Sequence, residues 1–220
     1  MLLCALIVFA PFSAATKISI SSSNHPKISL YWPLISQVYS NIGLETEIVE
    51  LPSARGLEEL RKGNFDADIL RLAHNVDAYE EIIKISPPLG EVTIFLLCHK
   101  SVECDLTLIE DEQRVVFASS GIKNLAQQTG SQLNYSTIEA ADKLLPLLTI
   151  GRIDYLVYAE HSEAKKALAA NFSMVELTKV YMHHVIHKKI AHLAPEISQQ
   201  LNKLLPSFNE RNRKIFARID

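Results

Sequence analysis

LEELRKGNFDADILRL, residues 57–72, is the stretch of sequence that decides the fold. A helix-like pattern is followed by Gly63, by Asp66 three positions later and then by a largely apolar run over residues 67–72. Glycine at the end of a helix adopts the left-handed backbone that other side chains resist, and a short apolar run is typical of a buried strand. The stretch therefore predicts a helix, a tight turn at the glycine and a buried strand.

The same pattern occurs a second time, as AADKLLPLLTIGRIDYLVY over residues 140–158. Gly151 and Asp154 take the places of Gly63 and Asp66. Two such helix-to-strand steps predict an α/β protein with two lobes of similar construction and a ligand cleft between them. We expect both aspartates to be structural, each ending its turn with a hydrogen bond to the backbone.

The composition is that of an ordinary globular protein, with 48% hydrophobic and 21% charged residues over 220 positions. The formal net charge is −3, and no run of lysine and arginine is present. Phosphate binding needs a basic surface, so we expect no nucleic acid as a partner.

The N-terminal stretch MLLCALIVFAPFSAA, residues 1–15, is apolar and ends in small residues. This pattern predicts a signal peptide removed near Ala15, and export to the periplasm as a soluble protein. The alternative interpretation is a buried N-terminal strand or a short anchor. Residues 1–15 are too few to cross a bilayer comfortably as a permanent helix.

Cys98 and Cys104 remain once the predicted signal peptide is set aside. An even pair suits an oxidising compartment, and a turn between them would allow a disulfide. The alternative is two free thiols, because the sequence does not set the Cβ geometry that a disulfide requires.

Hydrophobicity drops and charges gather around residues 101–112, where we place the first crossing between the lobes. The predicted organisation is a signal peptide over residues 1–15, a discontinuous first lobe over 16–100 and 183–220, and a second lobe over 101–182. We expect the lobes to close by a hinge motion near residues 101–105 and 178–182.

Three segments carry a family resemblance: Pro52-x-x-Arg55 with residues 63–66, residues 140–154, and residues 187–195 before the final helices. They resemble the bacterial extracellular solute-binding proteins of family 3. The resemblance implies the two-lobed type 2 periplasmic-binding-protein fold, each lobe a mixed sheet flanked by helices. It also implies a membrane partner, either an ABC-type permease or a sensor protein. We expect a monomer.

Arg55 and Arg71 are the candidate cations for an anionic ligand, because guanidinium holds a carboxylate in a bidentate fork. Arg55 lies in the first turn of a predicted helix and Arg71 at the end of a predicted strand, both places where a cleft opens. The alternative is that each is a surface arginine paired with Glu58, Asp68 or Asp77.

Other candidate ligand-binding residues come from the second lobe. Ser119, Ser120 and Gly121 form a turn before a predicted helix over residues 122–128, whose free amides could hold an anionic group. The alternative is a plain helix cap. Tyr158 ends the second apolar run and could stack on a ligand, or it could pack in the core.

Metal and catalytic sites are not expected. His183 and His187 would share a helical face, but residues 181–187 alternate as a strand, in which positions four apart lie too far apart to chelate easily. No serine-nucleophile, zinc-protease or phosphate-loop motif is present, so we predict neither a cofactor nor an enzyme.

The sequence therefore predicts an exported binding protein that captures a small polar or anionic, amino-acid-like solute for an ABC-type transporter. The alternative is a periplasmic sensory or interaction protein on the same fold that has lost small-molecule binding.

Overall fold

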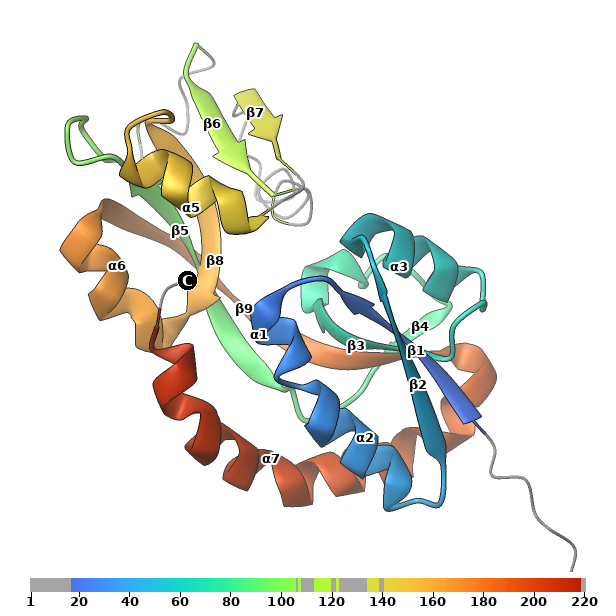
Figure 1. Cartoon of the computed structure of the whole chain (residues 1–220). Coiled ribbons are helices and arrows are strands. Elements are labelled where there is room, and N and C mark those ends of the chain that lie inside the picture. Colours follow the sequence, from blue (N-terminus) through green and yellow to red (C-terminus); the bar gives the residue numbers. More distant parts are fainter. Residues whose placement is uncertain are drawn as a thin grey trace, which may run out of the picture.

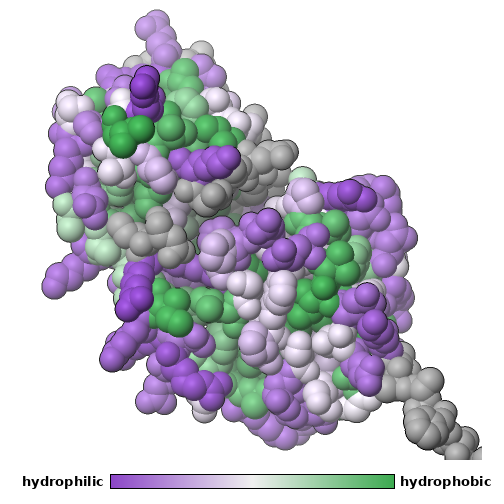
Figure 2. Space-filling model, in the orientation of Figure 1, coloured by the Kyte–Doolittle hydropathy of each residue, from purple (hydrophilic) through white to green (hydrophobic). Residues whose placement is uncertain are grey.

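The computed structural model describes residues 17–105, 107, 113–119, 122, 134–138 and 141–218, with the backbone alone for 141 and 142. The predicted signal peptide, Ser120, Gly121 and most of the predicted helix over 122–128 lie outside these residues. The described strands form one nine-stranded sheet in the order β2-β1-β3-β9-β5-β8-β6-β7, with β4 paired to β9. Figure 1 shows that the sheet and its helices form two lobes, and Figure 2 shows a narrower waist between them.

The elements of the two lobes follow each other along the chain. The first lobe contains β1 (Lys17–Ser23), α1 (Pro26–Ser29), α2 (Trp32–Ser40), β2 (Glu45–Leu51), α3 (Ser53–Arg61), β3 (Ala67–Leu72) and β4 (Ile82–Lys84). The second contains β6 (Val115–Ala118), β7 (Asn134–Thr137), α5 (Ala141–Thr149), β8 (Tyr155–His161) and α6 (Lys165–Asn171). The remaining long elements are β5 (Gly90–Cys98), β9 (Ser173–His187) and α7 (Ala194–Phe216); short 3-10 helices span Ala73–Asn75, Ser162–Ala164 and Lys188–Leu193.

The two lobes are built alike. In the first, β2, β1 and β3 are parallel and β3 pairs antiparallel with β9; in the second, β7, β6 and β8 are parallel and β8 pairs antiparallel with β5. The strands of the two sequence repeats, β3 and β8, therefore occupy corresponding places. Gly63 and Gly151 have φ of +76° and +67°, which confirms the left-handed turns predicted from the repeat.

β9 runs between the lobes (Figure 1). Its first part, from Ser173 to Met182, pairs with β5, and its last part, from Met182 onward, pairs with β3 and β4. The sequence pattern predicts two strands here, over residues 174–177 and 181–187. This prediction is wrong, because one continuous strand serves both lobes. Since the sheet is also continuous through β5, it defines no single boundary, and the predicted lobe limits and hinge segments stay predictions.

Two prolines affect the helices differently. The helical spacing of apolar residues predicts a single helix over residues 28–42. The structure divides it into α1 and α2, because Pro33 lacks an N–H group and lies in the first turn of a new helix. Pro206 does not divide α7, which continues past it and curves beneath the first lobe (Figure 1). The far end of α7 reaches the second lobe, so this helix connects both.

A disulfide joins Cys98 at the end of β5 to Cys104. The structure thus decides in favour of the disulfide over two free thiols. No helix among the described residues is both long and apolar enough to cross a membrane.

Candidate functional site

A cavity of about 610 Å³ lies between the two lobes. The first lobe lines it with the turn after β1, the starts of α1 and α3 and the end of β3, and Met182 from within β9 also lines it. The second lobe lines it with residues after β6 and at the end of β8. The polar and aromatic lining residues include His25, Lys27, Tyr31, Ser53, Arg71, Asn75, Ser119, Tyr158, Glu160 and His161.

Arg71 is held in place by three hydrogen bonds to two residues, Asp68 and Ser53. It lies near the end of β3, is 4% exposed, and donates to Asp68 at 2.5 Å and to the backbone and side-chain oxygens of Ser53 at 2.8 and 2.9 Å. Ser53 is the first residue of α3, and its sequence position after Pro52 predicts a helix cap; its hydroxyl makes no capping bond and accepts from the arginine instead. A Cβ at Gly56 would lie 2.8 Å from the guanidinium, so α3 needs a glycine there to approach β3 this closely.

Lys27 crosses the cleft. This residue of α1 is buried, and its Nζ donates at 2.7 Å both to Glu160 at the end of β8 and to the backbone carbonyl of Arg218 after α7. The second carboxylate oxygen of Glu160 accepts from the backbone N–H of His161 at 2.8 Å. The Lys27 ammonium therefore joins the two lobes through its ion pair with Glu160, and it joins them to the segment after α7 through its hydrogen bond to Arg218.

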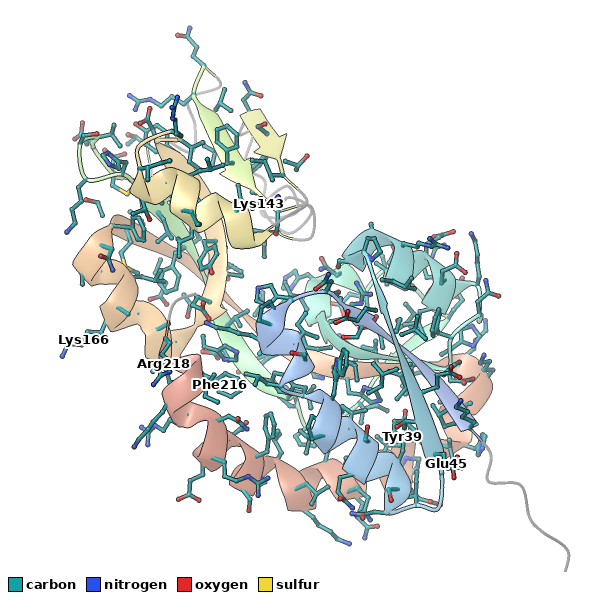
Figure 3. The ribbon with its side chains drawn as sticks, viewed as in Figure 1. Tyr39, Glu45, Lys143, Lys166, Phe216 and Arg218 are labelled. Carbon is teal, nitrogen blue, oxygen red and sulfur yellow. A yellow bond between two sulfur atoms is a disulfide. The ribbon has the colours of Figure 1, made fainter. Side chains whose placement is uncertain are left out.

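Aromatic rings close one side of this contact. Phe216, labelled with Arg218 in Figure 3 at the end of α7, stacks on His161 with ring centroids 4.2 Å apart and on Tyr31 at 5.9 Å. Burial, together with the positive charge of Lys27, lowers the pKa of His161 from 6.5 to about 4. The imidazole is therefore neutral near pH 7.

Three buried polar atoms of the lining have no hydrogen-bond partner among the described residues. They are the hydroxyl of Tyr31, Nε of Arg71 and the side-chain oxygen of Asn75. Buried polar groups in proteins are nearly always paired, so these atoms are candidates for contacts with a bound molecule.

Arg71, Ser119 and Tyr158 of the predicted site residues line the cleft. Arg55 is exposed on α3 and is not among the lining residues. Ser120 and Gly121 lie outside the described residues. The ligand-binding roles of all six stay predictions.

Sequence reasoning missed Lys27, Glu160 and His161. Glu160 could have been found from the repeat, because it ends the second repeat's strand much as Arg71 ends the first. Lys27 gave no such signal, since its partner lies 133 positions away in the sequence.

The histidines of β9 have local hydrogen-bond partners. His183 lies 2.9 Å from the carbonyl oxygen of Ile85, and His187 accepts from the backbone N–H of Lys189 at 3.1 Å. Within the described part of the chain, no three histidine, cysteine, aspartate or glutamate residues are grouped so that they could hold a metal ion.

Known proteins resemble this chain in their three-dimensional structure and not detectably in their sequence. No protein family model matches the sequence, and no curated protein matches it. Among solved structures, the GluR0 ligand-binding core from Nostoc punctiforme in complex with L-glutamate is similar, with a TM-score of 0.71, 14% identity and coverage of 91% of this chain and 100% of that one.

Two further structures are similar at the same level. An ancestral amino-acid-binding protein, described as a precursor of cyclohexadienyl dehydratase, has a TM-score of 0.70 and 14% identity, with 89% of this chain and 94% of that chain covered. A histidine kinase sensor domain with similarity to periplasmic binding proteins has a TM-score of 0.68 and 14% identity, with 91% and 95% covered. The chain has the two-lobed periplasmic-binding-protein fold, which confirms the fold predicted from the sequence.

Proposed function

We propose that the chain is an exported receptor that captures a small polar or anionic, amino-acid-like solute between its lobes and carries out no covalent chemistry. The observation that carries this proposal is the cavity of about 610 Å³ lined by both lobes. Small-molecule sites typically have volumes of roughly 300 to 1,000 Å³. A solute that touches both lobes would favour the closed arrangement over an open one.

The charged groups of the cleft favour binding over catalysis. Arg71 and Glu160 are each held in a buried ion pair with several hydrogen bonds. A general acid or base must exchange a proton with a reacting group, and side chains that are fully engaged in this way are poorly placed to do so.

Export and the partner complete the proposal. We place the protein in the periplasm as a monomer and propose an ABC-type permease as the recipient of the solute, on the strength of the motif resemblance. Mass spectrometry of the protein recovered from the periplasmic fraction should find Thr16 as the first residue. Light scattering should give the mass of one chain.

Thermal unfolding tests solute capture directly. Residues 16–220 are heated with amino acids, small carboxylates, polyamines and sugars, one class at a time. A ligand present at about 100 times its dissociation constant should add roughly 2.7 kcal/mol to the free energy of unfolding. Tyr158→Ala should weaken the response because Tyr158 lines the cleft, whereas Tyr181→Ala, at an exposed tyrosine of β9 outside the lining, should leave it unchanged.

The second candidate function is a periplasmic sensory or interaction protein that has lost small-molecule binding. The ion pair between Lys27 and Glu160 favours it, because it joins the lobes without any ligand. This function predicts that no solute raises the unfolding temperature. It also predicts that X-ray scattering of the protein in solution gives the same compact profile with and without solutes.

A further inference from the structure

Three charged side chains line the cleft among the described residues: Lys27, Arg71 and Glu160. Each has a counter-charge within the protein. Asp68 lies 2.5 Å from Arg71, and Lys27 and Glu160 lie 2.7 Å from each other. Among the described residues, the two positive groups are thus each matched by a negative one.

The paired carboxylates are not easily displaced. Asp68 is fully buried and also accepts from the hydroxyl of Ser21 at 2.6 Å and from the backbone N–H of Leu70 at 3.1 Å. An anionic solute competing for Arg71 would leave this carboxylate buried with a negative charge beside it. Such a buried and unpaired charge is strongly unfavourable.

Glu160 is held in the same manner. One of its oxygens accepts from Lys27 and the other from the backbone N–H of His161. An anionic solute at Lys27 and a cationic solute at Glu160 would each have to break this pair. His161 adds no charge near pH 7, because burial lowers its pKa to about 4.

Three residues of the lining each carry a buried polar atom without a partner among the described residues, and a neutral group can satisfy each of these atoms. Nε of Arg71 needs an acceptor, the side-chain oxygen of Asn75 needs a donor, and the hydroxyl of Tyr31 takes either. Tyr31 and Arg71 are 1% and 4% exposed, so these groups are nearly removed from water. Hydroxyl and amide groups both donate and accept without carrying charge.

We infer that the cleft selects an uncharged solute bearing hydroxyl or amide groups, and that the built-in counter-charges Asp68 and Glu160 exclude small anions and cations. This inference rests on the proposed function and narrows its solute class. Asp68 and Glu160 then act as specificity determinants from within the protein, since each occupies the group that an ionic ligand would need.

The test removes the counter-charge of one cleft cation at a time. Asp68→Asn frees Arg71, and Asp77→Asn is the matched control, because it removes the same charge from an exposed pair with Lys84 outside the cleft lining. Thermal unfolding and calorimetry are run at constant ionic strength with succinate, putrescine, D-glucose and N-acetyl-D-glucosamine. We expect Asp68→Asn to bind succinate at least tenfold more tightly than wild type and Asp77→Asn do.

The outcomes separate this inference from the proposed function. Wild-type protein that binds succinate or putrescine as tightly as the uncharged probes would overturn the inference, as would an unchanged succinate affinity in Asp68→Asn. If Asp68→Asn does not fold, Glu160→Gln, which removes the carboxylate paired with Lys27, decides by the same tenfold criterion. If no solute binds wild type but the charge-released variant gains succinate binding, the built-in counter-charges are supported and it is the proposed function that fails.

Discussion

Arg71 and Glu160 occupy comparable places in the two lobes but obtain their counter-charges differently. Each lies near the end of the strand that follows a Gly-x-x-Asp turn, on β3 and β8. Arg71 pairs with Asp68, three positions away on the same strand, whereas Glu160 pairs with Lys27 of the other lobe. The pair of Arg71 with Asp68 therefore stabilises the first lobe alone. The pair of Glu160 with Lys27 holds the two lobes together.

The largest effect should come from Arg71→Met, which leaves Asp68 charged and buried. We expect a loss of free energy of unfolding toward the upper end of roughly 3 to 5 kcal/mol, the range for breaking a buried ion pair. Urea unfolding measures it, with Arg55→Met as the matched control at an exposed arginine. Equal losses in the two variants would show that the buried ion pair contributes no more to stability than an exposed arginine does.

Lys27→Met should have a smaller effect and a different signature. Separation of the lobes can return Glu160 to water, so we expect a loss of about 3 kcal/mol, at the lower end of the same range. X-ray scattering should show a larger radius of gyration, a change not expected for Arg71→Met. The double variant with Glu160→Gln should regain part of the stability, because neither member of this ion pair then carries a charge. A purely additive double variant would contradict the coupling.

The free energy of unfolding should depend on pH through two buried histidines, His184 inside the first lobe and His161 between the lobes. Burial lowers the pKa of His184, which bonds to Tyr39, to about 4, and His161 has a similarly lowered pKa. Both are neutral in the folded and unfolded chain above pH 6.5; below it only the unfolded chain takes up the protons, so stability falls as pH falls toward 4. The loss caused by each histidine should approach about 1.4 kcal/mol per pH unit once the pH is well below 6.5.

Urea unfolding at pH 7, 6 and 5 measures this slope. His161→Phe keeps a ring against Phe216 and should remove that histidine's share, about half of the combined histidine slope, while the share from His184 persists. A variant with the full wild-type slope would show that His161 does not titrate as proposed.

The smallest loss of stability is expected for alanine substitutions at the two glycine turns, Gly63 and Gly151. Alanine at either position is forced into the left-handed conformation, at a cost of roughly 1 to 2 kcal/mol. A Cβ at Gly63 would lie 3.2 Å from the ring of His187, whereas one at Gly151 would lie 3.5 Å from the ring of His99. Gly63→Ala should therefore be the more destabilising of the two in chemical unfolding, and the reverse order would show that packing around the turns does not distinguish the lobes.

Much of the fold could be predicted because its signals are local. Gly63 and Gly151 mark helix ends through backbone conformation. β3 occurs at the predicted bounds, residues 67–72, because its apolar pattern lies within the segment itself. The split at Pro33 was missed because apolar spacing continues across it. The continuity of β9 was missed because its register against β5 shifts at Leu177, and such an irregularity interrupts the period-two alternation that marks a strand in the sequence.

The site could be predicted only in part. Arg71 and Tyr158 were found because each ends a predicted apolar run of the repeat, although β8 continues past Tyr158 to His161. The sequence offered Glu58, Asp68 and Asp77 as equal partners for the arginines. The structure places Asp68 against Arg71 in a buried network, which turned a candidate anion-binding cation into a neutralised group.

The sequence by itself determined that two α/β lobes of like construction meet at a cleft, because hydrophobic periodicity and glycine turns act over a few residues. The tertiary structure alone decided which charges are paired across that cleft. Lys27 and Glu160 are 133 positions apart, and only the folding of the chain back onto itself sets the distance between such groups. Electrostatic interaction depends on that distance and on burial, neither of which is written in the local pattern.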